Sequence, residues 1–296
     1  MRILFATDGS TGAGQALRLV TSSFEPGGVE TVEVISVALH APPPDRAATH
    51  VVIEEHYRDA ADQLVKVSAE RLRAAGFEAI GTVMAGHPAE TIVTHAIATR
   101  PDLIVLGTRG LSGLRRRVVG SVSGKVVRYA PGSVLVARTA GPIRSVVVGY
   151  DASPDADEAI ELMARLPLKG NAQVIVCSAY DVVRPFSSGV APTMVAQVNA
   201  AYRDSLRWAR QAAEAMGTTA ERQLLERGVS ATHRIVPGPA HEQLAIVASE
   251  LSADLLVVGS RGLSGIQRFF LGSTSASLVA HPPTSVLVAR RTAGSR

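Results

Sequence analysis

PDLIVLGTRGLSG occupies residues 101–113, and a near-duplicate, ADLLVVGSRGLSG, occupies residues 253–265. In each copy an apolar, β-branched run ends in a glycine-rich segment, which is typical of a buried strand that leads into a loop. The runs LIVLG and LLVVG are apolar on both faces, as a parallel strand covered by helices on both sides must be. The two stretches therefore predict two copies of one α/β domain.

Other stretches repeat in the same order along the chain. Three further pairs are ILFATDGS (3–10) with VVVGYDAS (146–153), GHPAETI (86–92) with GPAHEQL (238–244), and SVLVAR at 133–138 and again at 285–290. A period of about half the chain indicates duplication of a domain rather than a solenoid. The turn-forming segment TAGP (139–142) joins the copies, so we place one domain at 1–140 and the other at 143–296.

The distance between equivalent residues grows by nine from the start of the copies to their glycine-rich segments, because Asp8 recurs as Asp151 and Gly107 as Gly259. We expect the additional residues of the second copy at 181–200, where RPFSSGVAPTM is typical of a loop.

Strand-like and helix-like runs alternate within each copy. In the first copy we expect strands at 2–7, 31–38, 79–84, 103–107 and 133–137, and helices near 12–23, 54–75, 88–99 and 120–130. Such alternation predicts right-handed crossovers and an open, parallel, five-stranded sheet with helices on both faces. Ligands of these sheets bind outside the carboxyl ends of the strands, where the winding direction reverses.

The composition narrows the class of protein. Hydrophobic residues make up 46% of the chain and charged residues 19%, with a formal net charge of +4. No dense basic stripe or nucleic-acid-binding motif is present, and the cluster Arg115–Arg117 is not repeated, so a nucleic-acid partner is not expected. The single cysteine, Cys177, lies in an apolar run and is expected to be buried in a reduced, cytoplasmic protein. No apolar run reaches the length of a membrane helix, and no signal peptide is evident.

Glycines recur at a fixed spacing after the fourth strand of each copy. The pattern G-x2-G-x9-G-[ST] is formed by Gly107, Gly110, Gly120 and Ser121, and again by Gly259, Gly262, Gly272 and Ser273. Glycine permits positive φ and close backbone approach to a ligand, and the helix that follows offers free N–H donors to phosphates. Hydroxyl groups in its first turn can donate to phosphate oxygens or cap the helix. The alternative is that these glycines only form turns.

An aspartate follows the first strand of each copy, at Asp8 and Asp151. A carboxylate at the end of a central strand can accept hydrogen bonds from ribose or adenine, or help to hold a metal. It can equally be the N-cap of the helix that begins shortly afterwards. The sequence leaves these alternatives open.

Together these motifs resemble the universal stress protein family, in a tandem form that belongs to its ATP-binding branch. The resemblance rests on ATDGS and GYDAS, on GTRGLSG…GSVS and GSRGLSG…GSTS, and on the closing APGSVLVAR and PPTSVLVAR. It implies a Rossmann-like fold similar to the adenine nucleotide alpha hydrolases, with ATP, with or without Mg²⁺, between strand one and the glycine loop. The site residues it implies in the first copy are Thr7, Asp8, Val37, Leu106, Gly107, Arg109, Gly110, Gly120, Ser121, Val122 and Ser123.

The same positions of the second copy give a second site. These are Tyr150, Asp151, Ala179, Val258, Gly259, Arg261, Gly262, Gly272, Ser273, Thr274 and Ser275. Tyr150 is larger than the residue common in the family and Ala179 is smaller, so the two either offset each other in volume or narrow the second pocket.

The resemblance also implies how the copies associate and what they do. The two SVLVAR strands are expected to pair antiparallel within one chain as an internal pseudo-dimer, and association of two chains into a homodimer stays open. No catalytic residue is repeated, since His87 and His281 each occur in one copy only. We therefore expect a nucleotide-responsive stress or signalling module that acts on unidentified protein partners, with slow ATP hydrolysis or phosphotransfer at the same sites as the alternative.

Overall fold

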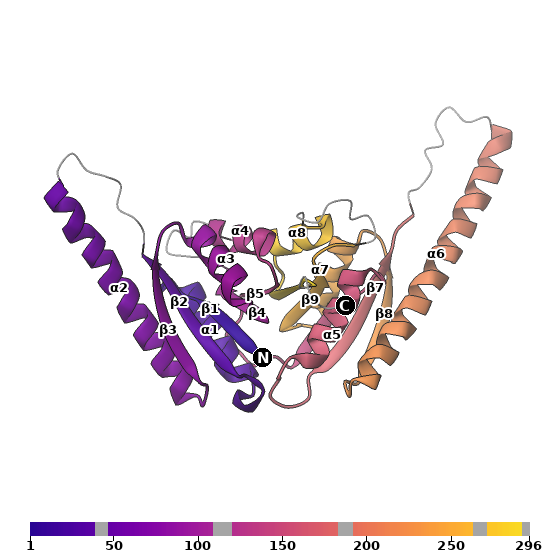
Figure 1. Cartoon of the computed structure of the whole chain (residues 1–296). Coiled ribbons are helices and arrows are strands. Elements are labelled where there is room, and N and C mark those ends of the chain that lie inside the picture. The colour runs from indigo at the N-terminus through magenta and orange to yellow at the C-terminus, as the bar shows by residue number, and fades with distance from the viewer. Residues whose placement is uncertain (39–46, 109–119, 183–191, 263–270, 292–296) are drawn as a thin grey trace.

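A computed structural model of the chain describes residues 1–38, 47–108, 120–182, 192–262 and 271–291 (Figure 1). The strands of the first half are β1 (Arg2–Ala6), β2 (Thr31–Ala38), β3 (Ala79–Ala85), β4 (Leu103–Gly107) and β5 (Ser133–Ala137). Its helices are α1 (Thr11–Ser23), α2 (Ala47–Ala74), α3 (Pro88–Thr99) and α4 (Ser121–Tyr129). The sequence predicts all nine elements, and α2 begins earlier than expected.

The second half repeats this order. Its strands are β6 (Ser145–Gly149), β7 (Gln173–Tyr180), β8 (Ala231–Pro237), β9 (Leu255–Gly259) and β10 (Ser285–Ala289). Its helices are α5 (Pro154–Arg165), α6 (Pro192–Glu226), α7 (Ala240–Glu250) and α8 (Ser273–Ala280). The halves differ most in their second helix, because α6 has 35 residues and α2 has 28. The prediction of a loop at RPFSSGVAPTM (184–194) is therefore wrong for 192–194, which belong to α6, and the second half has the longer helix.

All the strands join one sheet of ten, in the order β3-β2-β1-β4-β5-β10-β9-β6-β7-β8. Within each half every pair of neighbouring strands is parallel. The halves meet where β5 and β10 pair antiparallel, with Leu135 opposite Leu287. The predicted pairing of the two SVLVAR strands is confirmed, and it removes two open sheet edges at once.

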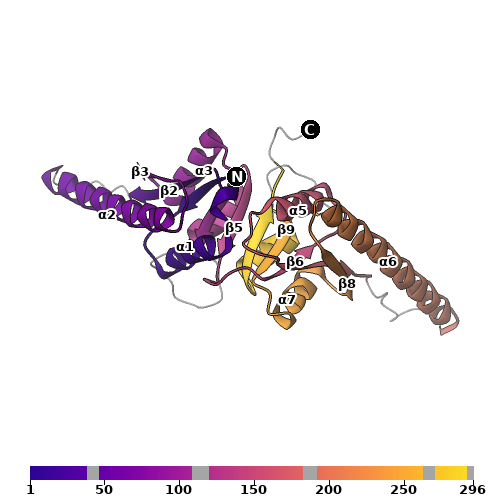
Figure 2. The same cartoon turned by 90° about the horizontal axis from the view of Figure 1, so that it is seen from below.

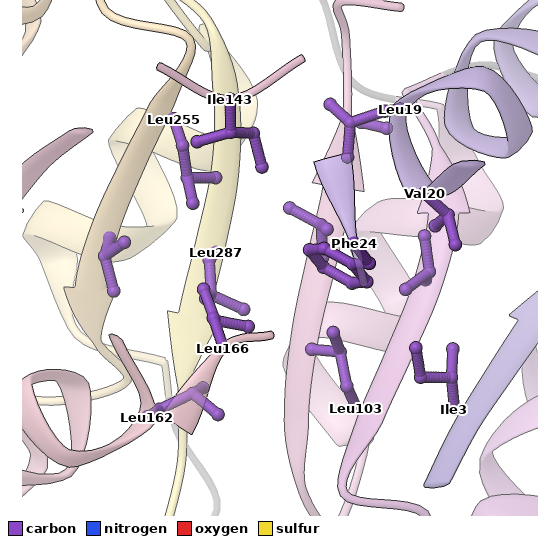
Figure 3. Close-up of a cluster of buried hydrophobic side chains, with 14 of the residues drawn as sticks. Ile3, Leu19, Val20, Phe24, Leu103, Ile143, Leu162, Leu166, Leu255 and Leu287 are labelled. Atoms are coloured by element: carbon purple, nitrogen blue, oxygen red, sulfur yellow. The ribbon is translucent and has the colours of Figure 1, made fainter. Parts of the chain in front are cut away.

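The helices cover the sheet as two layers. Residues of α1, α2, α5 and α6 form one buried cluster with the sheet, and residues of α3, α4, α7 and α8 form another on the opposite face. Both clusters contain side chains from each half. In Figure 3, Ile3 and Leu103 of the first half belong to the same cluster as Leu255 and Leu287 of the second. The long helices α2 and α6 lie on opposite flanks of the molecule (Figures 1 and 2). The duplicated domains therefore share one continuous core.

Two arginines, one at the end of each paired strand, form hydrogen bonds between the two halves. The guanidinium of Arg290, which follows β10, donates to the carbonyl oxygens of Val127 (3.1 Å) and Ala130 at the end of α4. Arg138, which follows β5, donates in the same way to the carbonyl of Pro282 beyond α8. A cation at a helix C-terminus satisfies the carbonyls that the helix leaves unpaired and complements its dipole. The helix that begins at each glycine loop thus ends on an arginine of the other half.

Replacing Arg290 with alanine removes the donors from the last carbonyls of α4. Because these hydrogen bonds involve a charged donor in a half-buried position, we expect the free energy of unfolding to fall by about 2 kcal/mol. Urea denaturation followed by circular dichroism measures the change. Arg291→Ala, at the exposed neighbouring residue, is the matched control. Equal midpoints for the two variants would show that the capping contacts contribute nothing to stability.

The turn after the first strand of each half requires a left-handed residue. In the first half this residue is Gly9, with φ of 73°, and in the second it is Ala152, with φ of 57°. A left-handed conformation costs a non-glycine residue about 1–2 kcal/mol. A Cβ on Gly9 would lie 2.5 Å from the Leu64 side chain, whereas Ala152 is exposed. The second half therefore carries a backbone strain that the first half avoids.

Ala152→Gly is expected to relieve this strain and to stabilise the chain by about 1 kcal/mol, because no buried contact is lost with the methyl group. Gly9→Ala is the opposite change and is expected to destabilise, through both strain and the contact with Leu64. Thermal unfolding followed by calorimetry compares the two variants. A lower unfolding temperature for Ala152→Gly would contradict the account of this turn.

Candidate nucleotide site

The strand order places the crevice of each half between its first and fourth strands. β6 and β9 lie side by side and parallel, so their carboxyl ends meet at one edge of the sheet. From there the chain crosses to α5 on one face and to α8 on the other, because these helices belong to opposite buried clusters. β1 and β4 have the same relation to α1 and α4 in the first half. A crevice at such a reversal is where open α/β sheets bind ligands.

A cavity of about 310 Å³ lies at this place in the second half. All eleven residues that the sequence predicts for the second site line it, namely Tyr150, Asp151, Ala179, Val258, Gly259, Arg261, Gly262, Gly272, Ser273, Thr274 and Ser275. Strands β7 and β9 supply apolar side chains, and the start of α8 supplies glycine, serine and threonine. The volume lies within the range typical of small-molecule sites.

Five residues of the lining are not among those predicted from the sequence. The additional residues are Gly149, Ala156, Cys177, Ala240 and Leu244. Two signals were available to find them. Cys177 is two residues before Ala179 on the same strand, so both side chains point to one face. Ala240 and Leu244 lie in the segment GPAHEQL, and its counterpart GHPAETI in the first copy marks it as part of the shared design.

The helices that begin at the glycine loops have no capping side chain. The N-cap residues of α4 and α8 are Gly120 and Gly272, and neither helix has a side-chain hydrogen bond to its first turn. By contrast, Ser10 caps α1 and Ser153 caps α5, each accepting a hydrogen bond of 3.2 Å from the backbone N–H three residues later. The start of α8 opens onto the cavity. Its free N–H groups and positive dipole end are suited to an anion.

Two hydroxyl groups that were expected to contact phosphates donate hydrogen bonds to backbone carbonyl oxygens instead. Ser123 is buried and its hydroxyl lies 3.1 Å from the carbonyl oxygen of Thr108, to which it donates. The hydroxyl of Ser275 donates in the same way to the carbonyl of Gly259. These serines fasten the helix start to the end of the fourth strand. The side chains of Ser273 and Thr274 remain beside them in the lining of the cavity.

The first glycine of each loop is required by packing rather than by backbone conformation. Gly107 and Gly259 do not have φ in the left-handed region. A Cβ on Gly107 would lie 2.3 Å from the carbonyl carbon of Gly12, and one on Gly259 would lie 2.6 Å from that of Asp155. Each strand therefore ends against the backbone of the first turn of its own half's first helix, at a distance that excludes a side chain. Of the two properties of glycine named above, the absence of a side chain is the one used at these two positions.

The aspartates after the first strands are not helix caps. One oxygen of Asp8 accepts from the N–H of Ser10, and one oxygen of Asp151 accepts from that of Ser153, both at 3.0 Å. The helix caps are the two serines themselves, so the N-cap alternative is wrong. The second carboxylate oxygen of Asp151 lies 2.6 Å from the point where a Cβ on Gly262 would stand. Asp151 therefore closes the turn with one oxygen and faces the glycine loop with the other.

Tyr150 and Ala179 do not compensate for each other. The ring of Tyr150 belongs to the cluster under α5 and α6, and its hydroxyl donates to Asp157 at 2.8 Å. Burial and this carboxylate raise the pKa of Tyr150 above its usual value, so the phenol stays protonated. Ala179 packs against the cluster on the opposite face. The side chain of Tyr150 therefore packs on the opposite face of the sheet from Ala179, and the cavity stays open.

An ion pair forms part of the wall of the second cavity. Nε and Nη2 of Arg261 donate to the two carboxylate oxygens of Asp155, at 2.9 and 3.0 Å. Burial raises the pKa of Asp155, but hydrogen bonds from Arg261 and Ser260 outweigh this and hold the pKa below its usual value. The hydrogen bond to Asp155 raises the pKa of Arg261. Both groups are therefore charged at neutral pH, and no pattern in the sequence predicts this pairing.

The described part of the first site has the same framework. Thr7 and Asp8 follow β1, Val37 lies on β2, and Leu106 and Gly107 end β4. Residues 120–123 form the start of α4. Arg109 and Gly110 lie outside the described residues. The structure thus brings the described members of the first site to the same strand ends as in the second.

Comparison with known proteins decides the family. The model of the universal stress protein family matches residues 1–138 and again residues 142–290. The chain belongs to the universal stress protein family. A universal stress protein of Thermus aquaticus is 34% identical over 137 residues, covering 46% of this chain and 97% of its own. One of Mycobacterium tuberculosis is 28% identical over 262 residues, covering 82% of this chain and 73% of its own.

A solved structure shows that the whole tandem arrangement occurs in this family. The crystal structure of a universal stress protein from Archaeoglobus fulgidus is similar over 98% of both chains, with a TM-score of 0.68 and 22% identity. At 22% identity, this similarity supports a shared fold and does not extend to function. Within the described residues of the present universal stress protein, no helix has the length and apolar character to span a membrane. The same residues contain no group of three or more His, Cys, Asp or Glu side chains suited to a metal.

The thiol of Cys177 lies in the cavity wall and gives a test of how closed that wall is. Burial raises the pKa of Cys177 to about 11, so about one thiol in a thousand is ionised at pH 8. We expect Ellman's reagent to react far more slowly with the folded protein than with the protein unfolded in urea. Raising the pH from 8 to 9 should speed the folded reaction about tenfold, because the thiolate is the reactive form. Equal rates for folded and unfolded protein would show that Cys177 is exposed.

Proposed function

We propose that this universal stress protein binds adenine nucleotides, ATP among them, at one site in each half and acts as a nucleotide-responsive module. The observation that carries the proposal is the uncapped start of α8, which opens onto a cavity with an apolar wall. An apolar slot suits a base, and free N–H groups at a helix start suit phosphates. Among the residues that the structure describes, no side chain accepts hydrogen bonds from those N–H groups, so an anionic ligand is the partner that the local chemistry favours.

The residues that line the second cavity suggest which of them would contact adenine, ribose and phosphates. Val258, Ala179 and Leu244 supply the apolar wall for adenine, and Asp151 faces the glycine loop where ribose would lie. Gly262 and the first turn of α8 would hold the phosphates. Asp151 would accompany Mg²⁺, which proteins commonly hold through one or two carboxylates together with substrate phosphates. By the repeat, Asp8 and residues 120–123 take these roles in the first half.

The proposed role is binding rather than turnover. Nucleotide occupancy would change the glycine loops and the starts of α4 and α8, and through them the surface offered to a protein partner. A cytoplasmic location agrees with the single buried thiol of Cys177, which has no partner for a disulfide within the chain. The division into residues 1–140 and 143–296 gives each site its own domain.

Gly262→Ala combined with Gly110→Ala tests the sites. A methyl group on Gly262 would stand 2.6 Å from the Asp151 carboxylate, inside the cavity wall, and Gly110 is the equivalent glycine of the first half. We expect titration calorimetry to show ATP affinity weakened by at least about tenfold, equivalent to about 1.4 kcal/mol. Gly141→Ala is the matched control, because a Cβ there meets nothing within 4 Å.

Unchanged ATP affinity in the double variant, with the fold intact, would overturn the assignment of the loops. Phosphate release under saturating Mg-ATP separates the binding module from its enzymatic alternative. Release well below the roughly 1–100 s⁻¹ of kinases is expected for a binding module, and a rate inside that range would favour the enzyme.

A further inference from the structure

The two halves differ in charge at one buried position beside the site. Ser10 and Ser153 cap α1 and α5 in the same way, which makes Gly12 the equivalent of Asp155. The fourth strands confirm the match, because Gly107 closes against the backbone of Gly12 as Gly259 closes against that of Asp155. A carboxylate therefore stands in the second half where the first half has no side chain.

This carboxylate is deeply placed and fully engaged. Asp155 is only 3% exposed, and both of its oxygens accept hydrogen bonds from Arg261. The hydroxyl of Ser260 donates to it as well. A bidentate pair of this kind fixes a guanidinium in direction as well as in charge. Arg261 is held at the cavity wall in an orientation set by Asp155.

The fold does not need this pair. In the first half the same strand closes against the same helix turn without a carboxylate, since position 12 is glycine. The duplicate is thus an internal control for the structural role of Asp155. What the pair does change is the charge of the cavity, because Arg261 lines it and Asp155 neutralises that cation. Asp151 adds a further negative charge to the same lining.

We propose that Asp155, acting through Arg261, makes the second cavity prefer adenine nucleotides with one phosphate over ATP. The inference rests on the proposed nucleotide binding and assigns different phosphate requirements to the two sites. Each further phosphate adds negative charge, which must compete with the carboxylate of Asp155 for Arg261. The first half, with Gly12, has no carboxylate at this position to oppose a triphosphate.

The test compares AMP, ADP and ATP by titration calorimetry at the second site, in full-length protein that carries Gly110→Ala to disable the first. With Asp155 present, we expect AMP to bind more tightly than ATP. Asp155→Asn keeps the shape of the side chain and removes its charge, so the preference should shift toward ATP by about tenfold. Asp155→Glu keeps the charge and should keep the preference for AMP, whereas a merely structural role would not separate Asn from Glu in this ratio.

The Gly262→Ala background gives the reciprocal measurement at the first site and does not depend on any variant of Asp155 folding. There ATP should bind more tightly than AMP, and adding Gly12→Asp should reduce that preference. If the second site binds nucleotides but its AMP-to-ATP ratio equals that of the first site, or stays unchanged in Asp155→Asn, the inference is overturned and the proposed function survives. If neither site binds any adenine nucleotide, the proposed function itself fails, and the inference with it.

Discussion

The reversal of the chain between neighbouring parallel strands is the constraint on which the rest of this structure depends. β6 and β9 end side by side, yet the chain leaves one toward α5 and the other toward α8, on opposite faces of the sheet. Two helix starts and two loops then face one crevice, with the backbone of β9 between them. A single strand order thus produces an apolar wall, a glycine loop and an uncapped helix terminus at the same place, without any further device.

The close approach of strand and helix explains why glycine is required at the beginning of the loop. Gly259 and Gly107 end their strands against the backbone of the first turn of α5 and α1. That contact sets how near the loop lies to the carboxylates after the first strands. Ser123 and Ser275 then fasten α4 and α8 to the same strand ends through backbone carbonyls. The N–H groups of the first turn of each helix have no capping side chain and are left for a ligand.

Pairing of β5 with β10 extends this local design across the molecule. It merges two sheets into one and lets each buried layer run through both halves. Arg290 and Arg138 add a specific link, since each caps the far end of the helix that begins at the other half's glycine loop. The two sites are therefore parts of one packed body, even though each is lined by its own half.

The sequence predicted most of the framework because it depends on local patterns that occur twice. Apolar runs, the repeat and the glycine spacing predicted the strand positions, and the resemblance to the family added the pairing of the SVLVAR strands and eleven of the sixteen residues that line the second cavity. It did not predict contacts between residues far apart in the chain. The hydrogen bond between Asp155 and Arg261 joins residues 106 positions apart in the chain. The repeat shows that Gly12 corresponds to Asp155, but the difference gains significance only once the structure shows that both positions contact the end of the fourth strand. Leu244 was not predicted for the same reason: it lines the cavity only because the sheet brings its helix, α7, next to the strand ends.

The most direct measurement of the central claim is the change in backbone amide resonances when ATP is added to ¹⁵N-labelled protein. The account predicts that the largest shifts fall on Gly259–Gly262 and Gly272–Ser275 and on the equivalent residues near Gly107 and Gly120, where N–H groups meet the phosphates. Shifts confined to other surfaces, or none at saturating ATP, would contradict it.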